Sequence, residues 1–126
     1  MRENITFEKA KKFAMRIWKL REYLEIEKKE YHVADQIFRS GTSIGANIAE
    51  SVYAASGADF INKLQIAIKE ASETEYWLDL LKEKGLMREE EYKSMIADCK
   101  EMLKILTSSL NSNKKKINEL TKNVKC

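Results

Sequence analysis

Residues 39–51, "RSGTSIGANIAES", decide the fold of this chain, because they resemble a loop in composition and a helix in spacing. The stretch holds two of the chain's four glycines and five Ser, Thr or Asn residues, which all disfavour helix. Yet Ile37, Gly41, Ile44, Ile48 and Val52 lie three or four residues apart, as on one helix face. The spacing predicts a continuous helix from about residue 32 or 33 to about residue 54.

Gly41 and Gly45 lie inside this predicted helix, where each costs about 1 kcal/mol relative to alanine. We interpret them as a point of close packing, because a missing Cβ lets a neighbouring backbone or a large side chain approach. Trp18, Phe60 or Trp77 would fill such a groove. A phosphate-binding loop is the alternative, but the Gly-x-x-x-Gly spacing has no following lysine and lacks the P-loop pattern.

The remaining sequence also favours helix. It has no proline and is 44% hydrophobic, and its 126 residues are typical of one domain. Apolar stripes predict a helix from an N-cap at Thr6 to about residue 26, a helix from an N-cap at Ser56 to Gly85, and a helix after Leu86. Four helices with short connections predict an all-α, antiparallel up-down-up-down four-helix bundle.

Basic charge gathers at the C-terminal end. Residues 111–126 carry five lysines and one glutamate, a net charge of +4, whereas residues 1–110 carry 18 basic and 19 acidic residues, a net charge of −1. We therefore divide the chain into a four-helix bundle, residues 1–110, and a basic C-terminal extension, residues 111–126. Whether the last helix continues through Ile117 and Leu120 stays open, because Asn111, Ser112 and Asn113 weaken it.

A polar stripe lies beside the apolar stripe of the second helix, and the third helix offers glutamates that Arg39 could pair with. Buried charges are costly unless they are paired, so such a network is kept for register or for a subunit contact. The hypothesis of an interface or structural polar network covers Arg39, Ser43, Asn47, Glu50, Glu70 and Glu73. The alternative is a set of ordinary, half-exposed polar residues.

Two long segments also carry a family resemblance. "QIFRSGTSIGANIAES" and "GADFINKLQIAIKEASETEYWLDLL" resemble the helix 2 and helix 3 signatures of the bacterial four-helix bundle protein family, which includes the proteins of 23S ribosomal RNA intervening sequences. The resemblance covers about residues 7–110. The matching positions are Gln36, Arg39, Ser43, Ile44, Asn47, Ile48, Ala49 and Glu50, then Phe60, Leu64, Ile66, Ala67, Glu70, Glu73 and Tyr76-Trp77-Leu78. Ser51 replaces a commoner glycine or alanine, and Met87 replaces a polar N-cap.

The resemblance implies an antiparallel four-helix bundle that commonly assembles as a ring-shaped homopentamer. Similar bundles include the accessory protein of diversity-generating retroelements, which works with a reverse transcriptase and nucleic acid. The lysine-rich extension lies outside the pattern. Apolar residues outside the main stripes, Ile61, Ile66, Ile68 and Trp77, also give the third helix a second apolar face, as an interface helix would show.

Catalytic patterns are not evident. A single histidine, His32, excludes most His-based catalysis and a di-iron site with two Glu-x-x-His motifs. We expect no enzyme, no catalytic residue, no metal, no cofactor and no small-molecule substrate; facing glutamates remain a third, weak alternative. Cys99, expected to be half-buried, and Cys126 read as free thiols of a cytoplasmic protein. No apolar run approaches the roughly 20 residues of a membrane span.

Two functions remain. The first is a non-enzymatic, self-assembling bundle that acts as a scaffold or adaptor for RNA or an RNA-associated enzyme. The alternative is a protein that binds RNA or DNA directly through the first helix and the tail. The candidate contacts are Lys114, Lys115, Lys116, Lys122 and Lys125 in the tail, with Lys11, Lys12, Arg16 and Lys19 in the first helix. A solvated, lysine-rich helix end explains the tail equally well.

Overall fold

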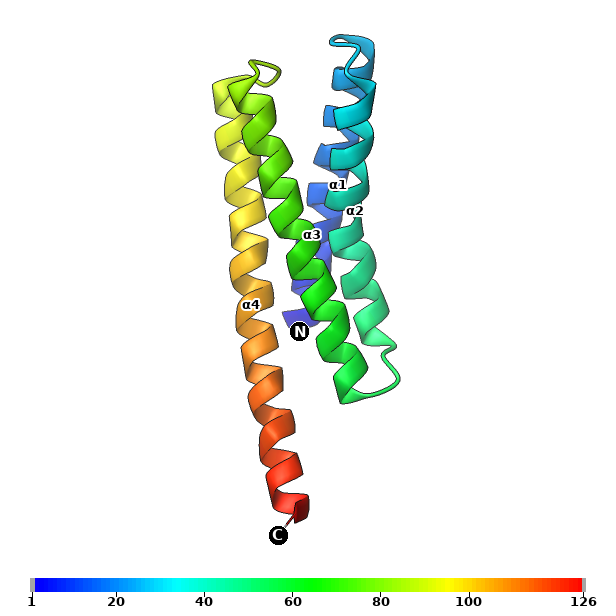
Figure 1. The fold of residues 1–126 in the computed structure, drawn as a ribbon, viewed down its shortest axis with the longest axis vertical. Helices are drawn as coiled ribbons and strands as arrows, with labels where there is room; N and C mark the ends of the chain where they lie inside the picture. Colours follow the sequence, from blue (N-terminus) through cyan, green and yellow to red (C-terminus); the bar gives the residue numbers. More distant parts are fainter. Residues whose placement is uncertain (1, 126) are drawn as a thin grey trace.

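The structure is a computed structural model that describes residues 2–125, with side chains described for residues 5–122. Its helices are α1 (Arg2–Ile26), α2 (Tyr31–Val52), α3 (Gly57–Glu83) and α4 (Glu89–Lys125). They run up and down in turn (Figure 1). Each helix packs against its neighbours in the chain and α1 also meets α4, so α1 lies diagonal to α3 and α2 diagonal to α4. The predicted all-α four-helix bundle is confirmed.

Helix α2 runs unbroken through the glycine-bearing stretch, as its apolar spacing predicts. The groove at the glycines is filled by α1 and not by an aromatic ring, so the expectation of Trp18, Phe60 or Trp77 is wrong. An ideal Cβ on Gly41 would lie 2.7 Å from Cγ1 of Ile17, and one on Gly45 would lie 3.5 Å from Cβ of Ala10. Small residues therefore bring α1 and α2 close together.

Helix ends follow the sequence signals at α3 and depart from them at α1. The hydroxyl of Ser56 accepts a hydrogen bond from the Asp59 amide at 3.1 Å, which makes Ser56 the predicted N-cap of α3. Gly85 follows α3 with φ of +74°, a left-handed conformation that favours glycine. The predicted N-cap at Thr6 is wrong, because α1 begins at Arg2 and Thr6 is buried four residues before Ala10 on the core face.

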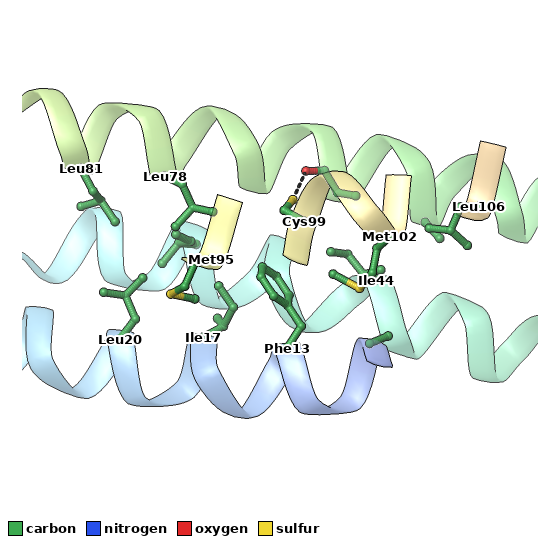
Figure 2. Close-up of a cluster of buried hydrophobic side chains, with 14 of the residues drawn as sticks. Phe13, Ile17, Leu20, Ile44, Leu78, Leu81, Met95, Cys99, Met102 and Leu106 are labelled. Carbon is green, nitrogen blue, oxygen red and sulfur yellow. Dashed lines mark hydrogen bonds between the residues drawn. The ribbon is translucent and has the colours of Figure 1, made fainter. Parts of the chain in front are cut away.

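The core contains side chains from all four helices (Figure 2). Cys99, expected to be half-buried, is fully buried in it, and its thiol donates to the backbone oxygen of Ala71 at 3.2 Å. Burial raises the pKa of this thiol to about 12. Val52, predicted on the buried stripe, is mostly exposed at the end of α2. The apolar spacing therefore identifies the core face except where a helix end leaves it uncovered.

Helix α4 passes through residue 110 without interruption, and this answers the question that the sequence left open. The amide of Asn113 donates to the Ser109 backbone oxygen at 2.7 Å, so a weak helix former satisfies itself within the helix. Ile117 is half-buried, and a Cβ on Gly57 would meet its Cδ1 at 2.9 Å. The C-terminal end of α4 then extends past the other helices (Figure 1). Among residues 2–125, no helix is long and apolar enough to cross a membrane.

Candidate functional site

The central polar contact between α2 and α3 is built around Arg39. Its Nη1 donates to Oε2 of Glu70 at 3.1 Å, and its Nη2 donates to Glu73. Glu73 also accepts from the indole Nε1 of Trp77 at 3.1 Å. The side chain of Glu70 is 10% exposed and that of Arg39 is 52% exposed, so the ion pair closes over a nearly buried carboxylate. The hydrogen bond to Glu73 raises the pKa of Arg39.

The structure does not bring the other predicted polar residues into this network. Ser43 donates to the Arg39 backbone oxygen at 2.5 Å, and Asn47 donates to the Ser43 backbone oxygen at 2.8 Å. Both bonds stay within α2. Glu50 instead pairs with Nζ of Lys63 at 3.0 Å, nearer the α2–α3 connection. Glu70 and Glu73 therefore share Arg39, whereas Glu50 pairs with a different cation.

A buried hydroxyl pair beside the Arg39 network escapes sequence reasoning. The Oγ1 of Thr74 lies 2.9 Å from Oγ of Ser40, and both residues are fully buried between α2 and α3. Thr74 also bonds the Glu70 backbone oxygen at 2.8 Å. The available signal was the position of Thr74 in the apolar stripe of the third helix. A polar residue at such a position needs a partner on the facing helix.

Some basic residues of α1 pair with α4 and others are exposed. Arg16 faces α4, where it pairs with Asp98 at 2.7 Å and Glu91 at 3.5 Å. Lys9 pairs with Glu101 at 2.8 Å across the same groove. Lys11, Lys12 and Lys19 are exposed, and Lys12 also lines this groove. Among the first-helix candidates for nucleic-acid contact, Arg16 is thus already paired with carboxylates of α4.

The groove between α1 and α4 is small and contains charged groups that pair with each other. Its volume is about 190 Å³, and its lining includes Phe13 and Met102 below Lys9, Asp98 and Glu101. Small-molecule sites commonly occupy about 300–1,000 Å³. Within the described residues, no group of three or more His, Cys, Asp or Glu side chains is placed to hold a metal ion. The ion pairs across this groove therefore join α1 to α4.

The tail candidates lie on the C-terminal part of α4. Lys114, Lys115, Lys116 and Lys122 are exposed helical residues. The side chain of Lys125 lies outside the described residues, as does Cys126. Because the extension is helical, its lysines project in directions fixed by the helix and do not all lie on one face.

Exposed apolar side chains gather on the outward sides of two diagonal helices. The α1 patch consists of Met15, Trp18 and Ile26, and the edge of Trp18 packs against the Phe38 ring of α2 at 5.0 Å between centroids. The α3 patch consists of the exposed Tyr76 and Leu80 with the half-buried Trp77, and the centroids of the two rings are 5.3 Å apart. Each patch exposes aromatic surface in the C-terminal half of its helix, so both lie at the same end of the bundle.

The exposed apolar residues of α3 differ from those that the sequence predicted for its second apolar face. Ile61, Ile66, Ile68 and Trp77 are all half-buried. Ile68 and Trp77 pack against the core, and the more exposed apolar area comes from Tyr76 and Leu80. The sequence signal for Tyr76 was present in the Tyr76-Trp77-Leu78 run, where only Leu78 is fully buried, and Leu80 follows two residues later.

Comparison with known proteins agrees with this architecture. A family model described as 23S rRNA-intervening sequence protein matches residues 2–108. Among solved structures, the chain is similar to a protein of unknown function from the S23 ribosomal protein family of Bacteroides thetaiotaomicron, with 50% sequence identity and a TM-score of 0.86. The match covers 88% of this chain and 99% of that chain. No protein with a curated description matches. Lys114 and the lysines after it lie beyond the family match.

Proposed function

The chain belongs to the 23S rRNA-intervening sequence protein family, and from this premise we propose that it is a non-enzymatic, self-assembling four-helix bundle. It acts as a scaffold or adaptor, with RNA or an RNA-associated enzyme as its partner. The observation that carries this proposal is the pair of exposed apolar patches on diagonal helices. Exposed aromatic and aliphatic side chains on one side of a helix are typical of an interaction site.

The positions of the patches favour a head-to-tail contact between copies. The α1 patch and the α3 patch are different surfaces, so the α1 patch of one copy can cover the α3 patch of the next. Both patches border α2, because Trp18 packs on Phe38 and Trp77 shares Glu73 with Arg39. Because the two patches flank the same helix, each copy is rotated relative to the one before it. Such a rotation favours a closed ring. The number five rests on the family resemblance alone.

The non-enzymatic part of the proposal is supported by what the polar groups already do. Arg39, Glu70 and Glu73 join α2 to α3, and the charged residues of the α1–α4 groove pair across it. These groups contribute to holding the helices together. The buried, unpaired thiol of Cys99 supports a reducing, cytoplasmic compartment.

The experiment is size-exclusion chromatography with light scattering on two charge variants. M15E/I26E alters the α1 patch and Y76E/L80E alters the α3 patch, while V52E/L120E places the same charge on exposed apolar residues outside both patches. The proposal expects a ring for the natural chain and for the control, and a monomer for each patch variant. A mixture of the two patch variants should form a dimer, because it retains one intact patch of each kind.

A natural chain that runs as a monomer at micromolar concentration would contradict self-assembly. Two patch variants that stay monomeric when mixed would contradict the head-to-tail contact, since a contact of like patches cannot form a mixed dimer. Circular dichroism of each variant separates loss of assembly from loss of fold. A fully helical, monomeric patch variant is the informative result.

A further inference from the structure

The outward face of α4 carries a row of lysines that begins within the bundle and continues into the extension. This lysine stripe consists of Lys93, Lys100, Lys104, Lys115 and Lys122, which are all exposed. Their separations of seven, four, eleven and seven residues return to nearly the same helix face, since one turn takes 3.6 residues. At 1.5 Å per residue the stripe spans about 43 Å. It is continuous only because α4 continues past residue 110.

Three acidic side chains of the same helix are engaged by α1. Glu91, Asp98 and Glu101 face α1 and pair with Arg16 or Lys9. In contrast, no carboxylate of the described chain lies within 4.0 Å of a stripe ammonium group. Three anions therefore lie in the α1–α4 contact, whereas the stripe lysines have no anionic partner among the described residues, although Glu89, Glu90 and Glu119 are also exposed on α4.

We propose that the lysine stripe binds the phosphate backbone of double-stranded nucleic acid. A straight row of cations matches a stiff, regularly charged polyanion, and Lys pairs with phosphate as a point charge. Base stacking on a single strand needs exposed aromatic rings, and the only large exposed apolar side chain described on α4 is Leu120. Leu120 lies on the core-facing side of the helix and not within the stripe.

The residues around the lysine stripe also disfavour two other kinds of partner, a membrane surface and a protein interface. A membrane-surface helix inserts apolar side chains beside its cations, and the stripe is flanked by small or polar residues such as Ala97, Ser108 and Asn111. A protein interface needs a buried apolar or aromatic anchor, and lysine is depleted at such interfaces. Glu119, which is exposed between the last two lysines, offsets one positive charge of the stripe.

The magnitude follows from counterion release. Five lysine–phosphate contacts give a slope of log K against log salt of about −4.5 for a duplex, so affinity falls about 500-fold between 50 and 200 mM salt. The variant K100Q/K104Q/K115Q leaves two contacts per stripe and a slope of about −1.8. The ratio of the two slopes, about 0.4, is the same however many stripes of an assembly engage one duplex. This ratio therefore does not depend on the ring proposed above.

The test is fluorescence anisotropy with duplex RNA and duplex DNA of about 25 base pairs, at rising salt, on the full chain. The matched control K29Q/K69Q/K84Q removes three exposed, unpaired lysines outside α4, none of them among the candidate contacts. The proposal expects the control to keep the natural slope and the stripe variant to lose more than half of it. Binding of RNA and DNA with one slope identifies the backbone as the ligand.

Equal slopes for the stripe variant and the control would overturn the proposal, as would loss of binding in the control variant alone. Binding of phosphatidylserine vesicles without binding of either duplex would overturn it in favour of a membrane surface. Assembly is measured separately by light scattering. A ring that binds no duplex therefore contradicts this inference alone, and a monomer that binds duplex with the expected slope contradicts only the proposed assembly.

Discussion

Replacing Gly41 with alanine inserts a methyl group at the closest approach of α2 to α1. The new Cβ would lie 2.7 Å from Cγ1 of Ile17 and 3.0 Å from both Cγ2 and Cδ1. Ile17 is fully buried, and a β-branched side chain in a helix has one strongly preferred χ1. Because Cγ1 and Cγ2 are both bonded to Cβ, a rotation that moves one away brings the other closer. The helices must therefore separate, or Ile17 must leave its rotamer.

The sign of the effect depends on two opposed terms. Overpacking of a core costs about 1–3 kcal/mol, and exchange of a mid-helix glycine for alanine gains about 0.5–1 kcal/mol. We expect G41A to lower the free energy of unfolding by about 1–2 kcal/mol. The matched variant G45A meets only an ordinary contact at 3.5 Å from Ala10, so it keeps the propensity gain and raises stability by about 0.5–1 kcal/mol.

Urea denaturation followed by helical circular dichroism measures both changes, at one protein concentration so that self-association contributes equally. The variant I17A supplies the coupling test, because it removes all three atoms that crowd the new methyl group. In the I17A background, G41A should become stabilising. A G41A variant that is as stable as G45A, or a destabilisation that persists in the I17A background, would refute the close-packing argument.

Three further predictions concern the buried polar groups and the α3–α4 contact. T74V should lower stability by about 1–3 kcal/mol because it leaves the Ser40 hydroxyl without its α3 partner, whereas S40A/T74V should be closer to neutral in urea denaturation. The Cys99 thiol, fully buried with a pKa of about 12, should be alkylated by iodoacetamide only in denaturant, as peptide mass mapping will show; labelling of the native chain would contradict its burial. Tyr92 donates to Asp79 at 2.5 Å, which raises its pKa from 10.0 to about 12. The folded state holds this proton more tightly, so the contribution of the hydrogen bond to stability is complete below about pH 10 and is lost as pH rises toward 12. Phenolate absorbance should show a late-titrating tyrosine that Y92F removes.

Helical periodicity predicts which face of each helix is buried, because 3.6 residues per turn fixes that face without knowledge of any neighbour. It does not predict which neighbour covers the face. Gly41 was correctly placed in a close contact, but α1 and α3 both flank α2, and the choice between Ile17 and an aromatic ring depends on how the helices rotate during packing. The same limit explains Ser40, whose partner Thr74 is 34 residues away in the sequence.

Helix ends were harder to predict than helix faces. Ser56 was recognised because its cap bond to Asp59 is local and has a known spacing. Thr6 is also a residue type that caps helices, yet it is buried within α1. Side-chain type alone does not distinguish a cap from a buried threonine, since either role satisfies the hydroxyl. Extra length at the start of α1 therefore went undetected.

The grouping of charged residues in the structure differs most from their grouping in the sequence. The basic residues of α1 look like one run in the sequence, but Arg16 turns into the groove with α4, and its partners Glu91 and Asp98 are 75 and 82 residues away. Conversely, the tail lysines look like a separate extension, but the continuity of α4 aligns Lys115 and Lys122 with lysines of the bundle. Two seven-residue repeats lie on different sides of α4. The acids Glu91 and Asp98 form one repeat, and the lysines Lys93 and Lys100 form the other. A heptad of acids that fixes α1 beside α4 therefore also fixes the direction of the lysines, and any change that rotates α4 in the bundle would move the lysine stripe out of solvent.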